Sequence, residues 1–80
     1  MQAEQIKAHI EGQIPDTQVQ VGMNGNHIDL VVVSPAFIRL SPLKKQQLVL
    51  GTLAAQFADG SIHAVDFIKT FTPDEWLAQK

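Results

Sequence analysis

The sequence predicts a small α+β domain in which helices pack on a three-stranded mixed sheet. Residues 17–23 and 27–33 alternate apolar and polar side chains on either side of Asn24-Gly25-Asn26. This is a β-hairpin pattern, because Asn and Gly tolerate the positive φ that tight hairpin turns require. A third strand-like segment, 62–71, follows a long helical stretch, and such a crossover returns the chain to the same sheet. Further helices are expected at both ends of the chain.

The first predicted helix covers residues 3–14. Ile6, Ile10 and Ile14 recur at i, i+4 and i+8, and they form one apolar stripe on the helix. Pro15 then ends the helix. His9 lies opposite the stripe and is expected to be solvated.

The two hairpin strands differ in their patterns. Residues 17–23 place apolar side chains on only one face, which predicts a half-buried strand. Residues 27–33 place Ile28, Leu30 and Val32 on one face, and their later half is apolar on both faces. The second strand is therefore expected to lie inside the sheet.

The main helix is predicted to run from Pro42 to about Ala58, after a short helical turn at 35–38. Ser41 is placed to cap it, with proline at the first helical position. Gly51 lies within this helix at a cost of about 1 kcal/mol relative to alanine. The residues expected along its apolar face are Leu43, Gln47, Leu50, Leu53, Ala54 and Phe57.

The third strand, 62–71, begins after the turn signal Asp59-Gly60 and carries His63 near its start. A histidine at that position can keep one edge in water. Thr72 to Glu75 has the form of a capping box that begins a last short helix, 73–80. A helix this short requires Trp76 to pack on the body of the domain.

Length and composition predict one domain, 1–80, without a disulfide, because the 80 residues include no cysteine. Histidine is then the best borderline metal donor in the chain. The sequence has neither a basic leader followed by an apolar run nor a stretch of about 20 apolar residues. A cytoplasmic protein without membrane contact is expected.

The charge distribution argues against a generally basic nucleic-acid binder, since the net charge is −2 and the pI about 5.8. Arg39, Lys44 and Lys45 nevertheless cluster within seven residues. Both lysines fall in the first turn of the main helix, where the helix dipole disfavours cations. This placement indicates a binding surface, and the alternative is an ordinary solvated helix start.

Motifs for catalysis or for nucleotide binding are absent from the sequence. It contains no cysteine nucleophile, nucleophile elbow, P-loop or dinucleotide fingerprint, so an enzyme is not expected. Residues 22–25 spell G-x-x-G, the backbone clamp of KH domains. In KH domains that loop joins two helices, whereas here it falls in a predicted hairpin.

Three segments together carry a family resemblance: residues 25–34, residues 40–47 with Lys44-Lys45-Gln46-Gln47, and Ile62-His63-Ala64 followed by the run from Thr70 to Trp76. In this order and spacing they resemble the BolA-like family, and they are most similar to its IbaG (YrbA) branch. The resemblance implies an α-β-β-α-α-β fold with a short C-terminal helix, similar to class II KH domains.

The resemblance also implies a partner and a cofactor. BolA-like proteins bind monothiol glutaredoxins and share a bridged [2Fe–2S] cluster, for which the glutaredoxin supplies a cysteine and bound glutathione. The BolA-like member supplies the histidine that matches His63 and a second ligand from the loop between the first two strands. His27, at the exit of that loop, is the candidate here. Alone, the chain would hold no cofactor and would be a monomer or weak homodimer.

Histidine ligation would give such a cluster particular properties. Replacing thiolates by imidazoles raises the potential of an iron centre, and ligation weakens as the pH falls because the ligand must lose its proton. A labile cluster suits trafficking or iron sensing, with Arg39, Lys44 and Lys45 positioning the partner. For His27 and His63 the alternative is an ordinary strand-end histidine.

The family also implies an alternative function, in which the chain is a KH-like DNA-binding transcriptional regulator connected with stress responses. The same cluster of Arg39, Lys44 and Lys45 would then contact phosphates. Three cations would give only weak, salt-sensitive binding.

Overall fold

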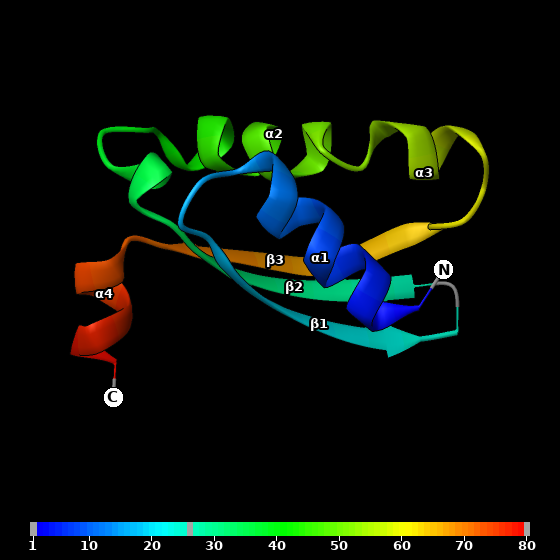
Figure 1. Cartoon of the computed structure of the whole chain (residues 1–80), viewed down its shortest axis with the longest axis horizontal. Helices are drawn as coiled ribbons and strands as arrows, with labels where there is room; N and C mark the ends of the chain where they lie inside the picture. The colour runs from blue at the N-terminus through cyan, green and yellow to red at the C-terminus, as the bar shows by residue number, and fades with distance from the viewer. Residues whose placement is uncertain (1, 26, 80) are drawn as a thin grey trace.

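The computed structural model describes residues 2–25 and 27–79. Figure 1 shows α1, α2 and α3 on one side of the sheet, and α4 at the end where β3 finishes. The elements are α1 (Ala3–Gln13), β1 (Gln18–Asn24), β2 (His27–Val33), the 3₁₀ turn η1 (Pro35–Phe37), α2 (Pro42–Gly51), α3 (Ala54–Ala58), β3 (Ala64–Phe71) and α4 (Pro73–Ala78). The α+β class and the element order predicted from the sequence are confirmed.

The sheet is mixed, with strand order β1-β2-β3. β1 and β2 form the predicted antiparallel hairpin, in which Asn24 pairs with His27. Gly25 has φ +65, as a tight turn of this kind requires. The predicted turn residue Asn26 lies outside the described residues. β2 pairs with β3 in parallel, so it is the interior strand, as predicted.

The core lies between α1 and the helix-facing side of the sheet. Ile6 and Ile10 of α1 are fully buried, and Ile14, just after the helix, is 2% exposed, which confirms the predicted isoleucine stripe. The inner face of β2 completes this layer. The buried cluster comprises Ile6, Ile10, Ile14, Val19, Ile28, Leu30, Val32, Phe37, Val49, Leu53 and Ile62.

The prediction of one continuous helix from Pro42 to Ala58 is wrong. α2 ends at Gly51, and α3 begins at Ala54. Between them the Thr52 hydroxyl donates to the carbonyl of Val49 at 2.7 Å, and the Leu53 N–H donates to Leu50 at 3.0 Å. These i→i−3 bonds tighten the turn and interrupt the i→i−4 ladder.

The predicted apolar face of this helix is only partly correct. Leu53 is fully buried, as predicted, and Val49, which was not predicted, is fully buried as well. Leu43 and Phe57, also predicted on this face, are 63% and 37% exposed. A Cβ on Gly51 would meet no atom within 4 Å, so this glycine is not required for close packing. The predicted cap is confirmed, since the Ser41 hydroxyl accepts the Lys44 N–H at 3.2 Å.

The expectation that His9 is solvated is wrong as well. His9 is half-buried, and its Nε2 lies 2.5 Å from the carbonyl oxygen of Thr52. The imidazole of α1 therefore contacts the break between α2 and α3. The Thr52 hydroxyl thus bonds within the turn, to Val49, and the Thr52 carbonyl oxygen contacts His9 on α1.

The third strand begins at Ala64, two residues later than predicted. Ile62 is buried, and its N–H donates to the carbonyl of Gln56 at 3.2 Å, so it belongs to the α3–β3 connection rather than to the sheet. His63 therefore precedes the strand.

The last helix, α4, ends at Ala78, and the predicted final residue Lys80 lies outside the described residues. The predicted capping box between Thr72 and Glu75 is confirmed. Trp76 contacts Phe71, with ring centroids 5.4 Å apart, so it packs on the end of β3 as the short helix requires. Among the described residues, no helix has the length and apolar character needed to cross a membrane.

Candidate functional site

The two histidines proposed from the sequence as ligands lie side by side at one end of the sheet. His27 is the first residue of β2 and pairs with Ala64, the first residue of β3, which directly follows His63. Their ring centroids are 6.1 Å apart, and the ring planes are inclined by only 18°. The parallel register of β2 and β3 thus brings the two imidazoles together.

Asp66 holds the orientation of one of these rings. His27 Nδ1 lies 3.0 Å from Asp66 Oδ1. The carboxylate accepts a hydrogen bond from Nδ1–H, and this tautomer leaves the lone pair of Nε2 free for another contact. Asp66 is the extra residue of β3 at a register irregularity, since Ile28 pairs with Val65 but Asp29 pairs with Phe67. Asp66 is not among the site residues predicted from the sequence.

The histidine pair, His27 and His63, is open to solvent. His63 is exposed, and the side chains of His27 and Asp66 are 45% and 42% exposed. Within the described part of the chain, no group of three His, Asp or Glu residues could hold a metal ion, and the full sequence has no cysteine. The pair can supply two imidazole ligands, so any further ligands would have to come from another molecule.

The predicted basic residues lie at the opposite end of the sheet. Lys44 and Lys45 are in the first turn of α2, and Arg39 precedes that helix with a left-handed φ of 69. Lys45 Nζ lies 3.8 Å from Glu75 Oε1 on α4, which follows the far end of β3. The seven residues of β2 span about 20 Å, so the structure does not bring the basic residues and the histidines into one site. Figure 1 shows the start of α2 and α4 at one end and the start of β3 at the other.

The three basic side chains are not equivalent. Arg39 and Lys44 are exposed, whereas the side chain of Lys45 is only 15% exposed beside Glu75. Hydrogen bonds from the backbone and side chain of Thr72, with the charge of Lys45, lower the pKa of Glu75 from its ordinary value. Lys45 therefore forms an ion pair between α2 and α4. Arg39 and Lys44 are the exposed members of the cluster, and a partner could contact them.

The G-x-x-G pattern at 22–25 has a structural explanation. Gly22 lies in β1 opposite Asp29 of β2. A Cβ on Gly22 would collide with the Asp29 carboxylate, which lies across this position. The pattern falls in a strand and hairpin turn instead of joining two helices, so it does not have the setting of a KH clamp.

The sequence is similar to BolA-like proteins over nearly the whole chain. The BolA family model, described as BolA-like protein, matches residues 3–75. The chain is 37% identical over 80 residues to the acid stress protein IbaG of Escherichia coli K12, across 100% of this chain and 94% of that protein.

Solved structures give the same result. A bolA protein homologue from Coxiella burnetii superposes with a TM-score of 0.82 at 31% identity, covering 96% of this chain and 97% of that one. The BolA1 protein of Mus musculus superposes with a TM-score of 0.74 at 29% identity, covering 96% of this chain and 69% of that one.

Proposed function

Because this chain belongs to the BolA-like family and to its IbaG branch, we propose that it is a non-enzymatic iron–sulfur accessory protein. In this proposal it binds a monothiol glutaredoxin in the cytoplasm and shares a bridged [2Fe–2S] cluster with it, for cluster trafficking or iron sensing. The observation that carries the proposal is the placement of His27 and His63 side by side on an exposed end of the sheet.

The histidine pair could supply half of the ligands of a [2Fe–2S] cluster. A [2Fe–2S] centre is held by four ligands, and two imidazoles replace two thiolates on one iron in Rieske centres. His27 and His63 are two such imidazoles, and the chain has no thiol of its own. A glutaredoxin cysteine and glutathione would supply two thiolates. The cluster would contribute one-electron redox chemistry, and the residues of this chain would bind and orient it.

Asp66 gives His27 the form that a ligand needs. Metal-ligating histidines generally donate their second ring N–H to a carboxylate or carbonyl, which fixes the tautomer and the ring orientation. His27 has this arrangement, with Nδ1 3.0 Å from Asp66 Oδ1. In the proposal the Nε2 atom of His27 faces the partner, and His63 supplies the second imidazole.

The basic residues have a limited part in this proposal. Because about 20 Å separates Arg39 and Lys44 from the histidine pair, only a partner that extends along the sheet would contact both. Their role in positioning a glutaredoxin is therefore separable from ligation. Substituting Lys44 should change the affinity for the glutaredoxin and not the spectrum of the assembled cluster.

The proposal is tested by reconstitution. The protein is mixed with a monothiol glutaredoxin, iron, sulfide and glutathione, and visible absorption and circular dichroism are recorded. His63→Ala should change the spectrum, and His27→Ala should still form a cluster but lose it faster. Lys69→Ala, on the middle of β3, serves as the control. A His63→Ala spectrum identical to that of the wild type would contradict ligation by His63.

A second candidate function is weak DNA binding by a transcriptional regulator. The observation in its favour is the exposure of Arg39, just before α2, and of Lys44, in its first turn. With Lys45 held by Glu75, two phosphate contacts are expected, and log K should fall with log salt with a slope of about −2. Titration of a duplex at two salt concentrations tests this, and absence of binding at low salt removes the candidate.

A further inference from the structure

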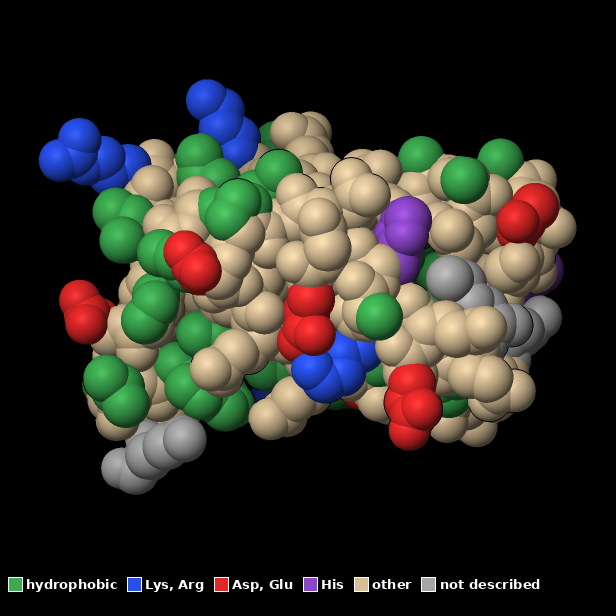
Figure 2. Space-filling model, in the orientation of Figure 1, with side chains coloured by type: hydrophobic (Ala, Val, Ile, Leu, Met, Phe, Trp, Pro, Cys, Tyr) green, Lys and Arg blue, Asp and Glu red, His purple; other side chains and the backbone are tan. Residues whose placement is uncertain are grey.

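The outer edge of β1 is an unpaired sheet edge in the described part of the chain. β1 comes first in the strand order β1-β2-β3, and the strand that pairs with it there is β2. α1 runs beside β1 in the opposite direction, and Figure 1 shows the start of α1 close to the end of β1. Figure 2 shows this side of the molecule, where acidic side chains flank a basic one over α1. The strand edge and the helix therefore border one strip of surface.

The hydrogen bond of Val19 shows which backbone groups of β1 face outward. The Val19 N–H donates to Glu11 Oε2 at 3.1 Å instead of to β2. Because successive residues of a strand direct their backbone groups to opposite sides, those of Val21 and Met23 also point away from β2. Among the described residues, the outward groups of Val21 have no hydrogen-bond partner. Glu11 thus takes at Val19 the place of a carbonyl on a fourth strand, and the edge is open at Val21.

A groove of about 280 Å³ lies along the same edge. Its lining residues come from α1 and β1 and are Ala3, Glu4, Lys7, Val19, Gln20 and Val21. The side chains of Val19 and Val21 lie on the helix side of the sheet, since Val19 is buried and Val21 packs against the core. The groove is smaller than the about 300–1,000 Å³ usual for small-molecule sites. It suits the alternate side chains of an extended chain.

We propose that an extended segment of a partner protein binds here as a fourth strand, antiparallel to β1, with every second side chain in the groove beside α1. In strand addition of this kind, main-chain hydrogen bonds give affinity, and pockets for alternate side chains give specificity. Antiparallel pairing is slightly more stable per residue than parallel pairing. The bound residue opposite Val21 exchanges both backbone hydrogen bonds with it, and its side chain lies in the groove.

The charges beside the groove determine which segment fits. Glu4 is exposed, and Lys7 forms an ion pair with Glu11. The hydrogen bond from Lys7 lowers the pKa of Glu11 below its ordinary value, so Glu11 is ionised at neutral pH. The uncompensated charge beside the groove is therefore negative. The complementary segment has β-branched side chains at alternate positions and a lysine or arginine next to them.

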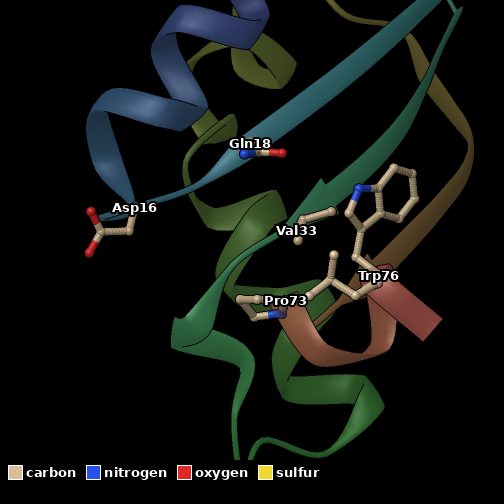
Figure 3. A pocket seen from close by; sticks show the side chains of 6 residues that line it. Asp16, Gln18, Val33, Pro73 and Trp76 are labelled. Carbon is tan, nitrogen blue, oxygen red and sulfur yellow. The ribbon is translucent and has the colours of Figure 1, made fainter. Parts of the chain in front are cut away.

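The pocket beside Trp76, at the other end of β1, is not suited to strand addition. Figure 3 shows Val33 and Trp76 side by side in this pocket, with Gln18 and Pro73 at its sides. Its two strand residues, Gln18 and Val33, pair with each other, so their backbone groups already belong to the ladder between β1 and β2. This second pocket provides the control site for the test.

A peptide titration followed by ¹H–¹⁵N NMR tests the proposal. The probe is an acetylated and amidated heptapeptide, Lys-Val-Thr-Val-Thr-Val-Lys. The amide signals of Val19, Val21 and Met23 should shift on addition of the peptide. Shifts centred on Trp76, or no shifts at millimolar peptide, would overturn the proposal. Dilution-dependent shifts of Val21 without peptide would show that a second copy of the chain occupies the edge, and would overturn it as well.

N-methylation of the peptide tests the backbone pairing itself. With the valine side chains in the groove of an antiparallel pair, the valine amides point to β1 and the threonine amides point to solvent. Methylation of the central valine amide should weaken binding about tenfold, the loss expected for one hydrogen bond. Methylation of a threonine amide should leave the affinity unchanged. Equal affinities of the two methylated peptides, or the reverse order, would contradict the proposed pairing.

Substitutions in the protein locate the contact. Val21→Pro removes the outward N–H and no bond to β2, so binding should weaken about tenfold with unchanged far-UV circular dichroism. Glu4→Lys should weaken binding of the lysine-ended peptide about threefold. Asp74→Lys makes the same charge change on α4 and is the matched control, with unchanged affinity. Equal weakening by both lysine variants would contradict the role of Glu4. His63→Ala should leave peptide binding unchanged, so this test is independent of the cluster proposal.

Discussion

The imidazole rings of His27 and His63 are stacked, with centroids 6.1 Å apart, although His27 begins β2 and His63 lies just before β3. The register between β2 and β3 produces this relationship, because His27 pairs with the residue that follows His63. The contact places two imidazoles on one exposed end of the sheet. It is the structural basis of the proposed cluster site.

Asp66 should control how long a shared cluster persists. Asp66→Asn removes the carboxylate that accepts from His27 Nδ1 at 3.0 Å. Loss of such a supporting contact typically weakens metal affinity by about 10–100-fold. We expect the cluster to form with a near-wild-type spectrum and to decay faster, as measured by its visible absorption over time.

Asp29→Asn is the matched control for this variant, because Asp29 also carries a carboxylate near the sheet end but contacts Gly22 instead of a histidine. Its cluster should decay at the wild-type rate. Equal lifetimes for Asp66→Asn and the wild type would show that Asp66 does not support ligation.

Substituting alanine for Gly51 and for Gly22 should change the free energy of unfolding in opposite directions. At Gly51 a Cβ meets nothing within 4 Å, so alanine should stabilise the end of α2 by about 0.5–1 kcal/mol. At Gly22 a Cβ collides with the Asp29 carboxylate, and displacing that side chain should cost about 1 kcal/mol. Urea unfolding followed by circular dichroism gives both free energies of unfolding.

A double-mutant cycle separates the collision from an intrinsic effect of alanine in the strand. Adding Asp29→Ala to Gly22→Ala should recover most of the loss, because the colliding carboxylate is gone. Additive effects of the two substitutions would contradict the steric explanation.

Glu11 should make stability depend on pH. Its carboxylate accepts from Lys7 and, at 3.1 Å, from the Val19 N–H, so it joins α1 to β1. The hydrogen bond with Lys7, with a smaller contribution from Val19, lowers the pKa of Glu11 below its ordinary value of 4.5. A lowered pKa means that the native state favours the ionised form. Its stabilisation is therefore present above pH 4.5 and is lost as the pH falls through the folded-state pKa.

Glu11→Gln tests this dependence. At neutral pH the variant should be less stable by up to about 1 kcal/mol, the upper end for a partly exposed pair. The difference from the wild type should shrink as the solution is acidified below pH 4.5. Urea unfolding at a series of pH values measures it, and a difference that stays constant on acidification would contradict the assignment to the ionised carboxylate.

Local signals predicted most of the fold. The hairpin turn at Gly25, the Ser41 cap and the Thr72–Glu75 capping box each depend on neighbouring residues, and all three are confirmed. The break between α2 and α3 was missed because the chain has no proline there. It depends on the Thr52 hydroxyl and on the contact of the Thr52 carbonyl with His9, 43 residues away. A contact over such a sequence separation leaves no periodic pattern.

The candidate site was predicted only in part. His63 and His27 were identified as candidates, but their proximity follows from a strand register that a single sequence does not specify. Asp66 was missed because its position across from His27 depends on the irregularity between Ile28 and Asp29. Lys45 was predicted to bind a partner together with Arg39 and Lys44, whereas it pairs with Glu75, which is 30 residues away on another helix.

The most direct test of the central claim is the visible circular dichroism of the reconstituted complex with a monothiol glutaredoxin, compared between His63→Ala and His63→Cys. If His63 is a ligand, alanine should abolish or change the cluster signal. Cysteine should restore a cluster with a distinct spectrum and a lower reduction potential, because thiolate replaces imidazole. Identical spectra for the wild type and both variants would show that His63 does not bind the cluster.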